Sequence, residues 1–274
     1  MAQDLGERIM QDMLRILSDD GVKNNVKLSH VLNLLARYRA REIGAALYRN
    51  GGNLVRSGPF QGMKIHNRTS EGNVAPKLLG IYERELHEVL ERCVETPYDC
   101  VVNIGCGDGY YAVGFARRMP KAKIQAYDLN AGRRDYCRAM ADENEVGERI
   151  SIGGECGAAE LEALRGQRVL VLCDIEDAER EVLDPAALPA LKDFDILVEL
   201  HEVLDANLPQ EIIARFADSH EIERIGHHGR DPYVFKELEK INQFDQWLAV
   251  WEGRQGRTPW AFMRAKSHIS KSHI

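Results

Sequence analysis

The sequence lacks long apolar runs and paired-cysteine motifs. None of its apolar stretches approaches the ~20 residues that a transmembrane helix needs, and residues 1–4 do not begin a signal peptide. The six cysteines include no Cys-x-x-Cys pair and mostly stand in apolar contexts, which argues against zinc ligands and a disulfide framework. We therefore expect a cytoplasmic protein with reduced thiols and no membrane association.

A long basic run is also missing. The formal net charge is −7, and acidic and basic residues are interspersed, so nucleic acid is not an expected partner. At 274 residues and 44% hydrophobic composition, the chain can bury one large α/β core with an appendage, or two small domains.

From residue 100 onward, strand and helix patterns alternate. We expect strands at 100–105, 123–128, 149–153, 168–174 and 194–200, and helices at 110–119, 132–145, 158–165, 178–192 and 208–218. Such alternation implies an α/β fold with a parallel sheet and helices on both faces. Two further strands, near 221–225 and 260–264, flank a helical insertion and predict an antiparallel pair at one edge. The result is a Rossmann-like, mostly parallel seven-stranded sheet.

The most informative motif is a glycine turn after the first of these strands. Gly105, Gly107 and Gly109 stand at alternate positions, and Tyr110 occupies the place of the third glycine of a dinucleotide motif. An acidic residue, Asp128, ends the next strand and can accept hydrogen bonds from two ribose hydroxyls. The short spacing and this acid favour S-adenosylmethionine over NAD as the cofactor. Glu155, after the third strand, either contacts the adenine amino group or is a solvated loop acid.

A second group of polar residues follows the central strands. Ligands of doubly wound sheets bind outside the carboxyl ends of the strands, so we expect five side chains at one rim. They are Asn103, Asp174, Glu176, Glu199 and His201. Acids at such positions also cap helices. We favour a capping role for Glu179 and a site role for Asp174.

The rim residues suggest how a hydroxyl group could be activated. A neutral histidine can remove a proton at physiological pH, so His201 is the expected catalytic base, with Glu199 or Asp174 orienting its ring. Alternatively, these side chains and Glu176 hold a divalent cation that lowers the pKa of the hydroxyl group. We expect no metal, because acids at strand ends more often serve as caps or substrate ligands.

The sequence resembles the FkbM-like branch of class I S-adenosylmethionine-dependent methyltransferases over residues 55–266. The resemblance rests on the motifs Asn103-Ile104-Gly105-Cys106-Gly107-Asp108-Gly109-Tyr110-Tyr111, Asp174-Ile175-Glu176-Asp177-Ala178-Glu179 with Val182-Leu183, and Val198-Glu199-Leu200-His201. Two residues depart from the pattern, since Asn103 replaces a usual acid and Asp177 a customary glycine. The resemblance implies methylation of hydroxyl groups on sugars and natural products, with Glu83 and Asn103 near the methionine end of the cofactor.

The resemblance also divides the chain. Residues 1–54 form a helical extension that serves as a lid or pairs with a second copy, 55–266 form the methyltransferase domain, and 267–274 form a disordered tail. The predicted activity is methyl transfer to a hydroxyl of a small molecule. The alternatives are an N- or protein methyltransferase on the same fold, and a non-catalytic cofactor-binding protein.

Overall fold

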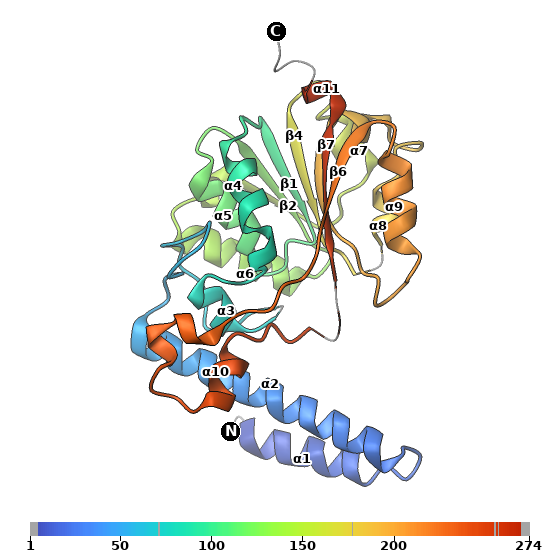
Figure 1. The fold of residues 1–274 in the computed structure, drawn as a ribbon. Coiled ribbons are helices and arrows are strands. Elements are labelled where there is room, and N and C mark those ends of the chain that lie inside the picture. Colours follow the sequence, from blue (N-terminus) through green and yellow to red (C-terminus); the bar gives the residue numbers. More distant parts are fainter. Residues whose placement is uncertain (1–4, 71, 177, 255, 257, 270–274) are drawn as a thin grey trace.

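A seven-stranded sheet forms the centre of the computed structural model, which describes residues 5–269 except 71, 177, 255 and 257 (Figure 1). The strands are β1 Cys100–Ile104, β2 Lys123–Tyr127, β3 Ile150–Gly153, β4 Val169–Cys173, β5 Asp195–Glu199, β6 His220–Ile225 and β7 Trp260–Ala265. Their order is β3-β2-β1-β4-β5-β7-β6. The first five strands pair in parallel, and β7 runs antiparallel to β5 and β6. The predicted Rossmann-like, mostly parallel seven-stranded sheet with an antiparallel pair at one edge is confirmed.

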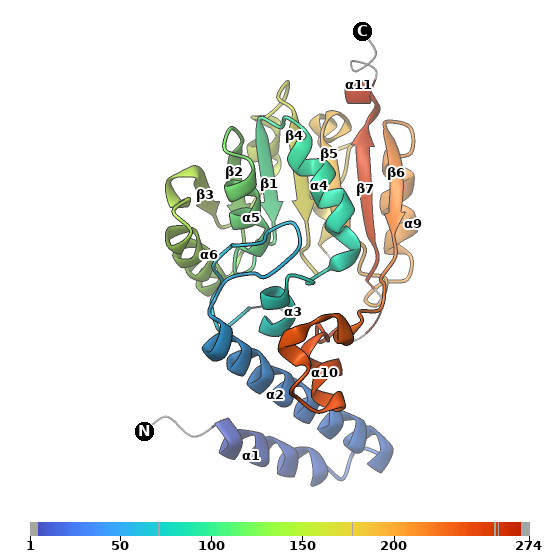
Figure 2. The ribbon, with the colours of Figure 1, turned by 60° about the vertical axis from the view of Figure 1, so that its left-hand side comes forward.

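Helices cover both faces of the sheet (Figure 2). One face carries α4 His87–Glu95, α5 Tyr110–Arg118 and α6 Ala131–Glu143, and the other carries α7 Ala158–Glu162, α8 Glu179–Val182 and α9 Leu208–Phe216. Alternate residues of β4 enter the two cores, with Leu170 and Leu172 on the first side and Val169 and Val171 on the second. This double burial explains why the strand is a continuous apolar run.

The predicted N-terminal helices are present as α1 Leu5–Leu17 and α2 Asn24–Gly51. The second half of α2 lies beside α3 Val74–Leu79 and α10 Gln243–Ala249, whereas α1 and the start of α2 extend away from the sheet (Figures 1 and 2). An ion pair of 2.6 Å between Arg39 and Asp245 joins α2 to α10. The extension is therefore attached to the domain through one half of one helix.

Proline shortens the helix that we expected over residues 178–192. Helix α8 ends at Val182, and a 3₁₀ helix, η3 Pro189–Asp193, follows later. Pro185 disfavours the helical backbone at the residue before it and cannot donate a helical hydrogen bond, so the prediction of one continuous helix is wrong. The other 3₁₀ helices are η1 Arg84–Leu86, η2 Gly147–Arg149, η4 Pro232–Val234 and η5 Lys236–Leu238.

The end of the chain also differs from the prediction of a disordered tail over 267–274. Residues Lys266–Ile269 form a helical turn, α11, and His268 lies 3.3 Å from the carboxylate of Asp195. Residues 270–274 lie outside the described part of the chain.

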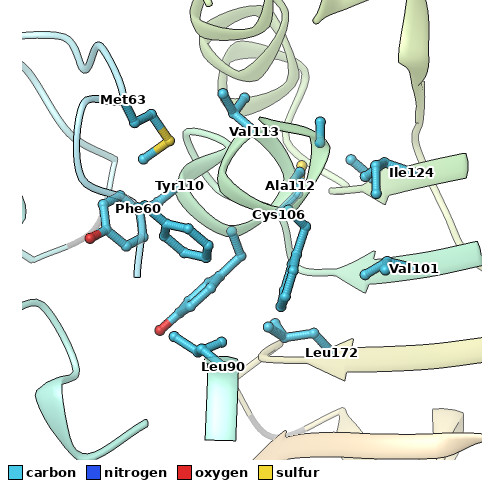
Figure 3. Close-up of a cluster of buried hydrophobic side chains, with 14 of the residues drawn as sticks. Phe60, Met63, Leu90, Val101, Cys106, Tyr110, Ala112, Val113, Ile124 and Leu172 are labelled. Carbon is cyan, nitrogen blue, oxygen red and sulfur yellow. The ribbon is translucent and has the colours of Figure 1, made fainter. Parts of the chain in front are cut away.

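The segment before α3 covers helix α5 and holds the glycine turn in place. Phe60 packs edge-on against Tyr110, with ring centroids 5.5 Å apart (Figure 3). Lys77 of α3 is 3% exposed and donates to Asp108 of the glycine turn at 2.8 Å. A buried ion pair with this geometry fixes the two segments relative to each other, so the turn is supported from outside the sheet as well as by β1.

Candidate active site

The glycine turn has the backbone shape that its spacing predicts. Gly105, Gly107 and Gly109 have φ values of 79°, 53° and 91°, a region that residues with a side chain rarely adopt. A Cβ atom on Gly105 would lie 1.7 Å from the carbonyl oxygen of Asp174. The end of β1 therefore passes directly against the end of β4, and a larger residue at position 105 would push the two strands apart.

Asp128 lies where the sequence predicts it, beside this turn. Its carboxylate is buried and accepts hydrogen bonds from the backbone N–H of Gly107 at 3.0 Å and of Asn130 at 2.8 Å. The guanidinium group of Arg133 lies 3.8 Å away. The bonds hold the carboxylate at the mouth of a cavity of about 330 Å³ that Gly105 and Asp128 both line.

That cavity has the size and lining of a small-ligand site. Apolar side chains form part of its walls, among them Leu129, Ile175 and Val182, and Glu155 is exposed at the rim. Apolar walls beside a few fixed polar groups are typical of small-ligand pockets. The structure therefore brings together the glycine turn, Asp128 and Glu155, as predicted from the sequence. The contact of Glu155 with adenine stays a prediction.

A second cavity, of about 310 Å³, adjoins the first. Arg133, Asp174 and Glu176 line both cavities. The second cavity also contains Arg37 from α2, and charged side chains dominate its lining. The two cavities thus meet at the end of β4, where a group bound in one can reach a group bound in the other.

His201 stands among three carboxylates at this junction. Its Nδ1 lies 2.7 Å from Glu179, and its Nε2 lies 3.2 Å from Glu199 and 3.5 Å from Asp174. Burial lowers the pKa of His201, but hydrogen bonds with Glu179 and Glu199 outweigh burial and raise that pKa to about 10. In this arrangement the imidazole carries its proton at neutral pH. The predicted neutral base therefore requires a change in these contacts.

Glu179 is a site residue that the sequence reasoning assigned to a helix cap. It begins α8 and accepts from the backbone N–H of Ile175, in the loop before the helix, at 3.4 Å, so it does not cap the helix itself. It is also fully buried and binds the ring of His201. Nothing in the local sequence, where Arg180 follows directly, indicated this contact, because the partner His201 comes from the end of another strand.

Glu83 belongs to a network of ion pairs that lines the second cavity. Arg254 contacts Glu83, Glu199 and Glu252, and the hydroxyl group of Tyr111 donates to Glu83. Burial raises the pKa of Glu83 to about 8, although the charge of Arg254 opposes this shift. Burial also raises the pKa of Glu199, but the bond from His201 and the charge of Arg254 hold it well below the usual range.

The remaining predicted residues are placed differently. Asn103 is 1% exposed, and neither polar atom of its side chain has a hydrogen-bond partner among the described residues. It lines neither of the two cavities. Its amide is thus a buried polar group that lies outside both cavities, and its contact with the cofactor stays a prediction. Glu176 is exposed, with a φ of 52°, and Asp177 lies outside the described residues.

Comparisons with known proteins return structures of methyltransferases. The O-methyltransferase TomG from Streptomyces achromogenes, solved with S-adenosylmethionine, is 12% identical, with a TM-score of 0.45 over 82% of this chain and 89% of that chain. An O-methyltransferase from Bacillus cereus, solved with S-adenosylhomocysteine, is 9% identical, with a TM-score of 0.45 over 95% and 99%. A precorrin-6Y C5,15-methyltransferase from Geobacter metallireducens is 12% identical, with a TM-score of 0.45 over 65% and 88%.

No family model matches the chain, and no curated protein matches it. The FkbM-like branch is therefore not confirmed. Among the described residues, no helix is both long and apolar enough to cross a membrane.

Proposed function

We propose that the protein is an S-adenosylmethionine-dependent methyltransferase that acts on a hydroxyl group of a polar small molecule. The observation that carries this proposal is the meeting of two cavities at the end of β4. One is bounded by the glycine turn and Asp128, and the other is lined by charged side chains around His201. A methyl donor in the first cavity and an acceptor in the second would lie side by side.

The cofactor supplies an electrophilic methyl group on a sulfonium centre, so the protein mainly has to hold and align the two reactants. The glycine turn would hold the cofactor, with Asp128 accepting from the ribose and Glu155 from the adenine amino group. The resemblance would add Asn103 and Glu83 near its methionine end, although Glu83 lines the second cavity and Asn103 lines neither.

Asp174, Glu199 and His201 would bind the acceptor hydroxyl, and His201 would receive its proton once acceptor binding changes the carboxylate contacts that keep the ring protonated. All three line the second cavity, and their polar atoms lie within 4.8 Å of one another. Sharing a proton between such groups favours the alkoxide-like oxygen that attacks the methyl group. We retain His201 as the catalytic residue and Glu199 and Asp174 as its partners.

The finer assignments are proposals as well. The FkbM-like branch, and with it a sugar or natural-product acceptor, rests on the sequence motifs around Gly105, Asp174 and Glu199. Small-molecule extracts and cell protein incubated with methyl-labelled S-adenosylmethionine test these proposals. A labelled small molecule supports them, labelled protein favours protein methylation, and binding without label transfer favours a non-catalytic role. Cytoplasmic location and the absence of nucleic-acid and membrane partners stay predictions.

Replacement of Asp128 by alanine is expected to weaken S-adenosylhomocysteine binding by about 10- to 100-fold. A hydrogen bond to a charged group contributes ~1.5–3 kcal/mol, and Asp128 also fixes the N–H of Gly107. Calorimetry measures the change. Asp135→Ala, which removes an exposed acid of α6, should leave the affinity unchanged. Equal affinities for both variants would remove Asp128 from the cofactor site.

We further propose that α1 and the first half of α2 pair with a second copy of this chain. Leu14, Leu28 and Leu32 are 62%, 63% and 63% exposed, and no residue of α1 is buried. A two-fold arrangement would place α1 and the first half of α2 of one copy against the same segment of the other, so that the exposed leucines of both copies are buried.

The double variant Leu14→Glu/Leu32→Glu is expected to convert a dimer into a monomer, because it places charges on the apolar surface that the pairing buries. Light scattering after gel filtration measures the mass. The control Gln11→Glu/Asn33→Glu adds the same charges at exposed polar positions of the same helices and should remain dimeric. A monomeric wild-type protein would contradict the pairing.

A further inference from the structure

Asp174, Glu199 and His201 offer three potential metal ligands at one point. One ligand atom from each lies within 4.8 Å of the others. Glu199 and His201 are 4% and 7% exposed, and all three residues line the second cavity. They come from the ends of two neighbouring strands, β4 and β5, so the sheet itself fixes their spacing.

The distances between these atoms match those between neighbouring ligands of one small cation. Nε2 of His201 lies 3.2 Å from Glu199 and 3.5 Å from Asp174. A cation with bonds of about 2.1 Å separates adjacent ligand atoms by about 3.0 Å in octahedral and 3.4 Å in tetrahedral geometry. No large rearrangement is needed to place an ion between them.

Neighbouring charged side chains also hold two of the proposed ligands in position. Glu179 is fully buried and holds Nδ1 of His201 at 2.7 Å, which leaves Nε2 facing Glu199 and Asp174. Arg254 contacts the other oxygen of Glu199. Histidine ligands of metals commonly bind a carboxylate through the second ring nitrogen, and such outer contacts orient the ligand.

The charges around the cluster favour a cation. The ion-paired network that includes it contains six carboxylates, two arginines and two histidines among the described residues. The acids are Glu83, Glu85, Asp174, Glu179, Glu199 and Glu252, and the basic side chains are His201, His227, Arg230 and Arg254. A divalent ion would offset part of this excess negative charge in a partly desolvated site.

We propose that Asp174, Glu199 and His201 bind one divalent cation of the Mn²⁺ or Zn²⁺ type. One nitrogen with two carboxylate oxygens suits these ions better than Mg²⁺, which prefers oxygen ligands alone. The role of the ion rests on the proposed function. It would act as a Lewis acid that lowers the pKa of the acceptor hydroxyl. The methyl–sulfur bond breaks as the oxygen–methyl bond forms, and the hydroxyl proton leaves through the open cavity to water.

Calorimetry of the metal-free full-length protein with MnCl₂ tests the proposal, with electron paramagnetic resonance as a second measure of bound Mn²⁺. We expect one site. Asp174→Asn and His201→Gln should each weaken it at least about 10-fold, and Glu179→Gln should weaken it about 10- to 100-fold, as removal of an outer contact does. Glu176→Gln removes an acid of the same cavity outside the ligand set and should bind Mn²⁺ as the wild type does.

S-adenosylhomocysteine binding, measured on the same samples, separates this proposal from the proposed function and confirms that each variant is folded. Loss of Mn²⁺ binding with retained S-adenosylhomocysteine binding supports the three-ligand site. A wild-type protein that binds S-adenosylhomocysteine but not Mn²⁺ overturns the cation site and leaves the methyltransferase proposal standing. Equal Mn²⁺ binding by the wild type and all four variants also overturns it.

Discussion

Replacing His201 with alanine is expected to lower methyl-transfer turnover by ~10²–10⁴-fold, while S-adenosylhomocysteine affinity stays within about threefold of the wild type. His201 lines the acceptor cavity and is not among the residues that line the glycine-turn cavity. The substitution therefore removes the group that contacts the acceptor hydroxyl, or that holds a cation there, without altering the cofactor contacts. Single-turnover kinetics with labelled cofactor measures the chemical step.

Two comparisons make this result specific. His228→Ala removes an exposed histidine from the loop after β6 and should keep wild-type turnover. Glu199→Gln should reduce turnover less than His201→Ala if Glu199 only orients the ring. Full activity of the His201 variant would show that the acceptor needs no activation, and alignment of the two reactants would then be the whole contribution of the site.

Replacing Gly107 with valine is expected to abolish S-adenosylhomocysteine binding, with a loss above about 100-fold. The residue has a φ of 53°, which a β-branched side chain strongly disfavours, and its N–H binds the carboxylate of Asp128. Calorimetry measures the affinity.

Gly166 provides the matched control for backbone strain. It has a φ of 84°, and a Cβ atom there would meet no atom within 4 Å. Gly166→Val imposes similar strain away from the cavities and should retain wild-type affinity. Equal losses in the two variants would attribute the effect to misfolding and not to the cofactor site.

The fold was predictable because its signals are local. Buried parallel strands are short apolar runs, and the run Val169–Cys173 had to be a strand buried on both faces. The spacing of Gly105 and Gly107 indicates the tight turn by itself, since the backbone there needs glycine. The acid at the end of the next strand, Asp128, follows from counting along the chain.

The acceptor side of the site was predictable only in part, because its contacts come from segments far apart in the sequence. The positions of Asp174 and His201 follow from strand ends, but their pairing with Glu179 depends on how α8 returns to the sheet. Arg254 sits in the connection between α10 and β7, where no periodic pattern constrains the chain. The raised pKa of His201 follows from these tertiary contacts, so sequence reasoning treated the residue as an ordinary histidine.

The central claim is that the glycine turn and Asp128 bind S-adenosylmethionine. Calorimetric titration of the wild-type full-length protein with S-adenosylhomocysteine and, separately, with NAD tests it most directly. The account predicts one S-adenosylhomocysteine site of micromolar affinity, roughly −8 kcal/mol, and no measurable NAD binding. Tight NAD binding without a response to S-adenosylhomocysteine would contradict it.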